Sequence, residues 1–260
     1  MSAPAPPPIS ALFVVRDEAA VIVRAVAAVR ALVDEVVVVD TGSVDATPVL
    51  AKAAGARVLK SAWKGYGPTK NIGAEACLHD WVLSLDADEV PDAALAAALT
   101  GFAPEAGHVY GFRRVTNYCG QWIEHGAWGR DTVWRLYDRR SVRWDERVVH
   151  EKLVVPEGGC RVGLPGRLLH YSYPTHGAFV DKQAHYLALS VEALRQNRQP
   201  VGWGKRHLSP YWRLFRDYVL LGGWRDGRAG WTIARADMWM VGEKYRRVGR
   251  GVDEGPGPRP

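Results

Sequence analysis

The sequence contains little cysteine and lacks any long apolar run. Its three cysteines, Cys77, Cys119 and Cys160, lie far apart and are odd in number. They form neither a CxxC metal-binding motif nor a disulfide framework, so we expect a protein of the reducing cytoplasm. No segment approaches the ~18 apolar residues that a membrane-spanning helix needs. The opening residues, MSAPAPPPIS, do not have the basic and then apolar pattern of a signal peptide, and we expect none there.

Positive charge is unevenly distributed along the 260 residues, of which 47% are hydrophobic. This length and composition can bury a full core, as one large domain or as one domain plus an appendage. Residues 200–250 hold eleven Lys and Arg residues against four Asp and Glu residues, an excess of seven, whereas the rest of the chain is close to neutral. We expect the C-terminal fifth to contact something anionic.

Strand-like and helix-like segments alternate over the first hundred residues. Apolar strand-like runs cover 10–16, 35–39, 57–59 and 81–85, and helical patterns cover 18–33, 45–54 and 69–78. Continuous apolar strands separated by helices predict a mostly parallel sheet with helices on both faces. Further strands are expected at 108–118, 132–140 and 149–155, and a helix at 175–195. In such α/β sheets, ligands bind at the carboxyl ends of the strands.

The segment WVLSLDADEV (81–90) ends an apolar strand in three carboxylates. Residues i and i+2 of a strand point the same way, so Asp86 and Asp88 can share one target. Close carboxylates repel unless a cation lies between them, and Mg²⁺ or Mn²⁺ is the oxygen-preferring choice. The alternative is that Asp88 and Glu89 only favour the start of a helix opened by Pro91.

Two other turns follow strands in the same way. In VVVVDTGSVDAT (36–47) a buried strand leads to Asp40, which could hydrogen-bond a base or ribose, while the amides of the turn receive phosphate or sugar oxygens. In GYGPTKNIG (65–73), Lys70 and Asn71 open a helix whose amides would attract a diphosphate. Ordinary turn and capping chemistry explains either segment equally well. No GxGxxG fingerprint of dinucleotide binding is present.

Taken together and in this order, FVVRDE, VVVVDTGSVD, GPTKNIG and LSLDADE resemble the family 2 glycosyltransferases of the GT-A fold. The resemblance covers roughly residues 9–173 and continues into GRDTVWRLYDRR (129–140) and VVHEKL (148–153), which are similar to bacterial lipopolysaccharide-core glucosyltransferases. It implies a Rossmann-like, mostly parallel sheet flanked by helices, with a C-terminal helical appendage that is basic and aromatic. Many family members carry two acids before the Gly-Ser pair, whereas this chain has Asp40-Thr41.

The resemblance also implies roles for individual residues. Asp40 would contact the nucleoside, Lys70 the diphosphate, and Asp86 with Asp88 the ribose and a divalent metal. Separately from the resemblance, His150 could serve as a further metal ligand or as a hydrogen-bond donor to phosphate. The residues expected to bind the nucleotide sugar are Arg16, Glu18, Asp40, Ser43, Lys70, Asn71 and Asp86. A bound cation and Lys70 would stabilise the charge that develops on a diphosphate leaving group.

Inverting transfer needs a general base that accepts the proton of the acceptor hydroxyl. Asp131 matches a position where related enzymes place an acid near the acceptor, and Glu151 is its rival. A free carboxylate has a pKa of about 4, so partial burial would have to raise it. Asp131 is the preferred base. His170, in an apolar run, is expected to be a core residue rather than a ligand.

The segment SPYWRLFRDYVLLGGW (209–224) has two faces when it is plotted as a helix. Its aromatic and aliphatic residues fall on one side, with Leu220 as the exception, and Arg213, Arg216 and Asp217 fall on the other. Such a helix suits a membrane interface, where basic residues meet anionic headgroups, or packs on the catalytic domain instead. No nucleic-acid recognition motif is present, and we expect no nucleic-acid partner.

The sequence thus predicts a glycosyltransferase at the cytoplasmic face of the inner membrane. It would transfer a hexose from a nucleotide-diphosphate sugar to a lipid-linked saccharide such as lipopolysaccharide core, with Mn²⁺ or Mg²⁺ as cofactor. Glucose is the preferred candidate for the hexose, and a UDP-hexose is the preferred candidate for the donor. The alternatives are transfer to polyprenyl phosphate, a non-catalytic module that binds anionic lipid, and a nucleotidyltransferase, which the missing Gly-rich N-terminal loop argues against. The predicted division is a flexible start at 1–8, the catalytic domain at 9–198, the basic helical extension at 199–250 and a disordered tail at 251–260.

Overall fold

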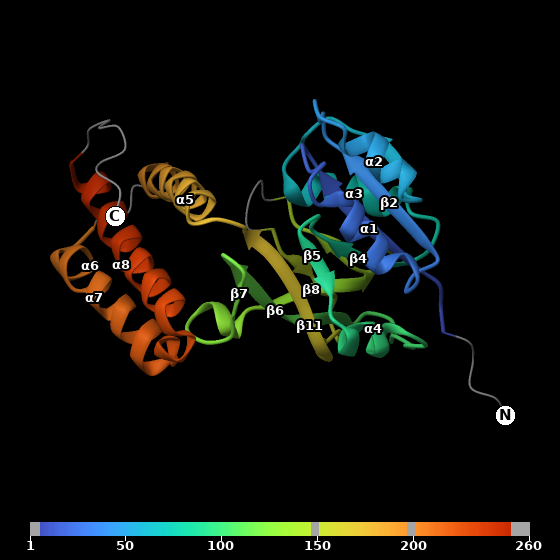
Figure 1. The fold of residues 1–260 in the computed structure, drawn as a ribbon. Coiled ribbons are helices and arrows are strands. Elements are labelled where there is room, and N and C mark those ends of the chain that lie inside the picture. The colour runs from blue at the N-terminus through green and yellow to red at the C-terminus, as the bar shows by residue number, and fades with distance from the viewer. Residues whose placement is uncertain (1–5, 147–150, 197–200, 251–260) are drawn as a thin grey trace. The chain divides into compact units, whose positions relative to one another are not determined.

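The computed structural model describes residues 6–146, 151–196 and 201–250, and these form two compact units. The first unit comprises Met1–Arg114 and Thr132–His170, and the second comprises Val115–Asp131 and Tyr171–Pro260. The sheet and four helices make up the first unit, and most of the second is helical (Figure 1). The predicted α/β class is confirmed, and the predicted extension at 199–250 belongs to the second unit.

Four parallel strands form one half of the main sheet. They lie side by side in the order β3 (Arg57–Lys60), β2 (Glu35–Asp40), β1 (Ile9–Val15) and β4 (Trp81–Leu85). The last pairs in register are Val15 with Asp40 and Phe13 with Leu85. The residues that follow β2 and β4 therefore emerge at the same edge, on either side of β1.

Helices cover both faces of these parallel strands because alternate strand residues point to opposite faces. Ala11, Phe13 and Val15 pack in the same core cluster as helix α1 (Ile22–Arg30). Leu12, on the other face, packs with Ala74 of helix α3 (Tyr66–Ala76). Helices α2 (Thr47–Ala53) and α4 (Ala93–Leu99) complete the helices of this unit.

An antiparallel extension continues the sheet beyond β4. It runs in the order β8 (Thr132–Asp138), β6 (Val109–Tyr118), β11 (Arg161–Tyr173) and β5 (Glu89–Pro91). Strands β6 and β11 cross from the first unit into the second. A separate two-stranded sheet pairs β9 (Arg143–Trp144) with β10 (Leu153–Val154).

The second unit is built on a core of six buried residues from strand ends and helices. They are Tyr118, Ile123, Tyr173, Phe179, Ala229 and Ile233. Its elements are β7 (Gln121–Ile123), η1 (Trp128–Arg130), α5 (His176–Gln196), α6 (Trp203–His207), α7 (Ser209–Leu214), η2 (Phe215–Leu220), η3 (Gly223–Asp226) and α8 (Gly227–Arg250). Among the described residues, no helix is both long and apolar enough to cross a membrane.

Several predicted elements have different bounds in the structure. The helix expected at 18–33 is only α1, Ile22–Arg30. Pro91 does not open a helix: it ends β5, and α4 begins after Asp92, whose carboxylate accepts a hydrogen bond from the Leu95 amide at 2.8 Å. The strand expected at 149–155 is limited to Leu153–Val154 among the described residues.

The helix expected at 209–224 is interrupted. Helix α7 ends at Leu214 and continues as the π-helical segment η2 to Leu220. Gly222 then takes a left-handed conformation with φ of 73°, which ends the helical run before η3. A single α-helical projection therefore cannot describe the whole segment, although the separation into two faces persists along α7 and η2.

Candidate active site

Two acidic turns meet at the carboxyl edge of the parallel strands. Asp40 ends β2 with 3% of its surface exposed, and its carboxylate accepts a hydrogen bond from the Ser43 amide at 3.1 Å. Gly42 permits this tight turn because its φ is 101°, a region that side-chain-bearing residues avoid. Asp86 follows β4 on the other side of β1. The structure thus brings together two of the acidic turns that the sequence singled out.

Asp86 lies between two cationic side chains. Its Oδ2 atom is 2.5 Å from Nη2 of Arg135, and its Oδ1 atom is 3.7 Å from Nζ of Lys70. Burial acts to raise the pKa of Asp86, but the positive charge of Arg135 and then that of Lys70 outweigh it and hold the pKa far below its usual value. Asp86 is therefore a carboxylate at neutral pH, and 39% of its side chain is exposed to a ligand.

Glu89 fixes the positions of Asp86 and Arg135. The side chain of Glu89 is fully buried, and its Oε1 atom accepts hydrogen bonds from Arg135 at 2.8 Å and from Arg114 at 3.1 Å. Its Oε2 atom accepts a hydrogen bond from the Asp86 amide at 3.0 Å. Glu89 therefore fixes both the turn and the guanidinium that contacts Asp86. Neither Arg135 nor Arg114 was among the predicted site residues, although Arg135 lies within GRDTVWRLYDRR (129–140).

Asp88 pairs with a histidine that the sequence analysis expected to be a core residue. Nε2 of His170, on β11, lies 3.1 Å from Oδ2 of Asp88. His170 is brought opposite Glu89 and next to Asp88 because β11 pairs with β5. The histidine is largely buried and has a polar partner, and the expectation that it is not a ligand stays a prediction. The predicted metal ligand His150 lies outside the described residues.

The described residues include no group of three or more His, Cys, Asp or Glu side chains arranged to hold a metal ion. Asp88 and His170 nevertheless supply two adjacent donors, a carboxylate oxygen and an imidazole nitrogen. Such a pair is compatible with Mn²⁺ or Mg²⁺ because these ions are commonly held by one or two protein donors and by phosphate oxygens of the substrate. The donor chemistry of this pair therefore fits a metal that arrives with a nucleotide.

Lys70 is buried in the second turn of α3, with 3% of its side chain exposed. The prediction that Lys70 and Asn71 open this helix was wrong, because α3 already begins at Tyr66. Its Nζ atom lies 2.6 Å from Oε1 of Glu151 and 4.5 Å from the centre of the Trp144 ring. The side chain of the neighbouring Asn71 is hydrogen-bonded to β9. Its amide group donates to the backbone carbonyl of Trp144 at 2.9 Å and accepts from the backbone amide of Trp144 at 3.0 Å. Asn71 thus fastens β9 to α3, and β9 in turn supplies the ring beside Lys70.

The remaining predicted nucleotide-binding residues lie in the turns after β1 and β2. The hydroxyl of Ser43 accepts a hydrogen bond from the Asp17 amide at 3.0 Å, and the Glu18 amide donates to the Thr47 hydroxyl at 2.7 Å. Arg16 is mostly exposed, with its guanidinium 3.9 Å from the Asp17 carboxylate. These contacts fasten the two turns to each other at the carboxyl edge of the sheet.

Asp131 belongs to the second unit, where it follows η1. The segment before it is held by Asp226, a 6% exposed residue of η3 that the sequence analysis did not single out. The Asp226 carboxylate accepts from the His125 amide at 2.8 Å and lies 2.8 Å from the ring atom Nδ1 of His125. No sequence motif marked this pair, because its members are 101 residues apart.

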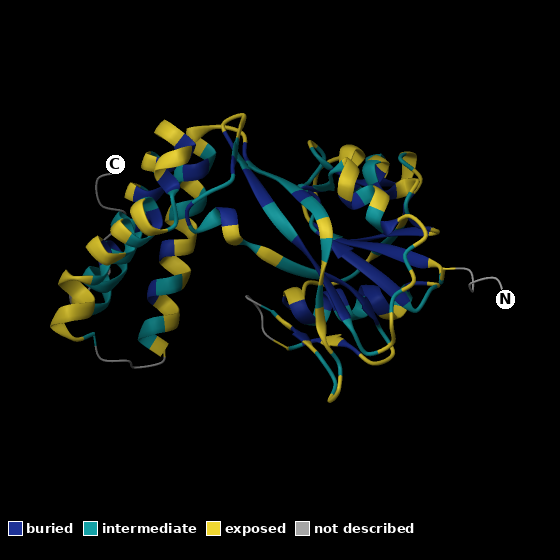
Figure 2. Cartoon of the chain, turned by 90° about the horizontal axis from the view of Figure 1, so that it is seen from below, coloured by how far each residue is buried: buried dark blue, intermediate teal, exposed yellow. Residues whose placement is uncertain are grey.

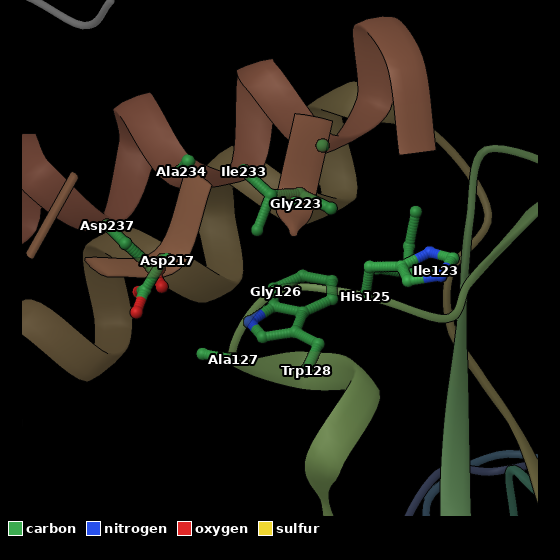
Figure 3. Close-up of a pocket in the computed structure, with 11 residues that line it drawn as sticks. Ile123, His125, Gly126, Ala127, Trp128, Asp217, Gly223, Ile233, Ala234 and Asp237 are labelled. Carbon is green, nitrogen blue, oxygen red and sulfur yellow. The ribbon is translucent and has the colours of Figure 1, made fainter. Parts of the chain in front are cut away.

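A small cavity borders the segment that precedes Asp131. It is lined by Trp128 and by residues of η2, η3 and α8 (Figure 3). Asp217 and Asp237 lie together at one end of it, and His125 lies at the other end. The cavity has room for a water molecule but not for a sugar. It is therefore a packing feature of the second unit rather than a substrate site.

Comparison with known proteins identifies the class. Glycosyl transferase family 2 matches residues 10–154, more than half of the chain, and the chain belongs to this family. Its fold is GT-A, as the sequence predicted, and membership of this family supports the predicted transferase class. The matched region contains Asp40, Lys70, Asp86 and Glu151.

Individual relatives cover the chain to different extents. The lipopolysaccharide core biosynthesis glycosyltransferase LpsC of Rhizobium meliloti (strain 1021) is 28% identical over 249 residues, which is 92% of this chain and 88% of the relative. An uncharacterized glycosyltransferase of Rickettsia felis is 44% identical over 81 residues, and this match covers only 29% of that relative's length.

Solved structures show a more distant similarity. Glucosyl-3-phosphoglycerate synthase from Mycobacterium tuberculosis, in complex with phosphoglyceric acid, is 20% identical with a TM-score of 0.47, over 75% of this chain and 82% of that one. The same enzyme in complex with Mn²⁺, uridine-diphosphate and glucosyl-3-phosphoglycerate gives a TM-score of 0.43 at 18% identity, over the same shares of the two chains.

Proposed function

We propose that the protein transfers a hexose, glucose before others, from UDP-hexose to a lipid-linked saccharide such as a lipopolysaccharide core. The reaction would proceed with inversion at the inner face of the inner membrane. The observation that carries the proposal is the position of Lys70, whose ammonium group lies beside Asp86 at the carboxyl edge of the parallel strands. The similarity to LpsC over 92% of the chain supports an acceptor of the lipopolysaccharide type.

The proposed donor site runs along this edge of the sheet. Asp40 would hydrogen-bond the nucleoside, with Arg16, Glu18 and Ser43 shaping the turns around it. Asp86 would accept hydrogen bonds from the ribose hydroxyls, since it is held as a carboxylate by Arg135. Lys70 would stabilise the negative charge that develops on the departing diphosphate, an electrostatic effect that is strong where water is excluded. Asn71 would contribute by fixing Trp144 beside Lys70.

Asp88 and His170 would hold Mn²⁺ or Mg²⁺, with His150 as a further predicted ligand. When bound, the cation supplies positive charge to the oxygens of the diphosphate. Asp131 would accept the proton of the attacking hydroxyl, and Glu151 is the alternative base. The ion pair of Glu151 with Lys70 favours Asp131, because a carboxylate that neutralises Lys70 is less available to an acceptor.

Calorimetric titration with UDP, GDP and ADP, each with and without Mn²⁺, tests the donor site. We expect UDP to bind only weakly without the metal and at least about tenfold more tightly with it, a difference of about 1.4 kcal/mol. Equal binding with and without Mn²⁺ would argue against the metal site, and no binding of any nucleotide would overturn the proposal. Transfer from UDP-glucose to isolated lipopolysaccharide core, compared with polyprenyl phosphate, then distinguishes the two classes of acceptor.

A further inference from the structure

The two-faced helix of the second unit packs with its polar side inward. Along α7 and η2, Asp217 is only 3% exposed. Arg213 forms ion pairs with Asp217 and, at 2.7 Å, with Asp237 of α8. These contacts attach α7 to α8 through charged side chains. The usual arrangement is the opposite, because an amphipathic helix normally turns its apolar side to the core.

Much of the apolar side of the same helices is exposed to solvent, whereas Leu214, Tyr218 and Leu221 are half-buried. Seven large apolar side chains in this segment each have 47–69% of their surface exposed, and we call them the aromatic face: Leu208, Tyr211, Trp212, Phe215, Val219, Leu220 and Trp224. Spacings of three and four residues place most of them on one side, and the rings of Trp212 and Phe215 lie 6.0 Å apart. Figure 2 shows exposed residues in yellow along the helices of this unit. A contiguous exposed apolar surface of this kind marks a site of interaction.

The exposed charged side chains around the aromatic face are all positive. Residues 201–236 are all described, and their only two carboxylates, Asp217 and Asp226, are buried. The exposed charged side chains of this segment are all cationic: Lys205, Arg206, Arg225, Arg228 and Arg235. Two copies of this surface would bring like charges together if they paired. The surface is instead complementary to an apolar partner that carries negative charge.

We propose that the aromatic face inserts into the interfacial region of a bilayer that contains anionic phospholipid. Trp212, Tyr211 and Trp224 have the ring chemistry that is favoured at the depth of the headgroups. Arg225, Arg228 and the pair Lys205-Arg206 would contact lipid phosphates, because basic side chains near such a surface are attracted to anionic headgroups. The inference rests on the proposed function for its purpose, since a lipid-linked acceptor is reached at a membrane, but the binding itself is measured without any transfer.

Co-sedimentation of the full chain with vesicles tests the proposal. The vesicles contain phosphatidylcholine alone or phosphatidylcholine mixed with phosphatidylglycerol. We expect at least about tenfold tighter binding to the mixed vesicles, and weaker binding as salt is added. The double variant Trp212→Ser with Phe215→Ser should bind mixed vesicles at least about tenfold more weakly than the parent chain.

A matched control changes two exposed apolar residues of the first unit. Val49 is 69% exposed and Leu78 is 72% exposed, and the double variant Val49→Ser with Leu78→Ser should bind vesicles like the parent chain. A second variant, Arg225→Gln with Arg228→Gln, should lose most of the preference for phosphatidylglycerol. Circular dichroism melting of each variant excludes loss of folding as the cause of any change.

Three outcomes would overturn the proposal. They are the absence of vesicle binding by the parent chain, unchanged binding by the Trp212 and Phe215 variant, and a dimer of the parent chain that becomes monomeric in that variant. The last result, from light scattering after size exclusion, would assign the face to a second copy. Nucleotide titration separates this proposal from the catalytic one: vesicle binding without nucleotide binding refutes the donor site only, and the reverse refutes the docking only.

Discussion

Lys70 and Glu151 are 81 positions apart in the chain, yet Nζ of Lys70 lies 2.6 Å from Oε1 of Glu151. The side chain of this lysine is almost completely buried, and the carboxylates of Glu151 and Asp86 balance its charge there. A diphosphate that entered this site would compete with Glu151 and Asp86 for the same ammonium group. The strength of nucleotide binding is therefore tied to how easily Lys70 changes partners.

Replacement of Lys70 by Met should remove the charge while it retains most of the side-chain volume. We expect the Kd for UDP with Mn²⁺ to rise at least about tenfold, because a charge-assisted contact to the diphosphate is lost. Calorimetry measures the change. Lys52→Met, at an exposed residue of α2, is the matched control and should bind UDP as the parent chain does. Unchanged binding by the Lys70 variant would remove Lys70 from the donor site.

The choice between the two candidate bases can be made by kinetics. Asp131→Asn should lower kcat by about 10²–10⁴-fold with little change in UDP affinity, since loss of a general base affects the chemical step. Glu151→Gln should instead alter UDP affinity, because it releases Lys70. A collapse of kcat in the Glu151 variant, together with an active Asp131 variant, would reverse the assignment.

Stability should fall in acid through Glu243, on α8. Hydrogen bonds from Arg246, and then from Arg247, outweigh burial and lower the pKa of Glu243 from 4.5 to about 2. Glu243 therefore binds a proton near pH 4.5 in the unfolded chain but only near pH 2 in the folded chain. The stabilisation that the ionised Glu243 gives to the folded state is complete above pH 4.5 and decreases as the pH falls below it. Glu243→Gln should lower the free energy of unfolding by about 1–3 kcal/mol at pH 7.

Urea denaturation at pH 7 and at several values down to pH 3 checks this expectation. The difference between the Glu243 variant and the parent chain should shrink as the pH falls. Glu75→Gln, which removes an exposed ion pair with Arg143, is the control and should change stability by about 0–1 kcal/mol. A pH-independent difference at Glu243 would contradict the lowered pKa.

The three cysteines should differ in reactivity. Burial first, and the nearby charge of Glu35 second, raise the pKa of Cys77 to about 11, whereas Cys119 and Cys160 are exposed. Because the thiolate is the reactive form, iodoacetamide at pH 8 should alkylate two cysteines quickly and leave Cys77 intact. Mass spectrometry counts the alkylated cysteines, and unfolding in urea should allow Cys77 to be alkylated as well. Three equal rates in the native protein would mean that Cys77 is not buried.

Gly73 marks a close approach of α3 to the sheet. A Cβ atom at this position would lie 2.5 Å from Cδ1 of Leu12 and 2.9 Å from Cγ2 of Val39, both of which are fully buried. Gly73→Ala should therefore lower the free energy of unfolding by about 1–3 kcal/mol through overpacking. Gly163→Ala, where nothing lies within 4 Å of the added atom, should change stability little. Urea midpoints compare the two variants.

The parallel half of the sheet was largely predictable from the sequence. The strand expected at 10–16 is β1, Ile9–Val15, and the strand expected at 81–85 is β4, Trp81–Leu85. Uninterrupted apolar runs define such strands because both faces of a parallel sheet are covered. The same reasoning placed Asp40 and Asp86 at the carboxyl ends of strands, and the structure has both at the same edge of the sheet, on either side of β1.

The side-chain pairs of the site could not be predicted in this way. Arg135 meets Asp86 because β8 pairs with β4, and His170 meets Asp88 because β11 pairs with β5. Antiparallel pairing between distant segments depends on register, which no local pattern specifies. The helix at 209–224 illustrates a second limit. Its two faces were visible in the sequence, but the ion pair of Arg213 with Asp237, 24 positions further along the chain, was not.

The passage of β6 and β11 from one unit into the other has a consequence for how the chain can be divided. A chain that ends at residue 198 would retain Tyr118, Ile123, Tyr173 and Phe179 but lose Ala229 and Ile233, which complete their core. Such a truncated protein would present these aromatic rings to water and would be prone to aggregate during expression. Deletion of the C-terminal segment is therefore a poor way to study the catalytic unit, and point variants on the intact chain are preferable.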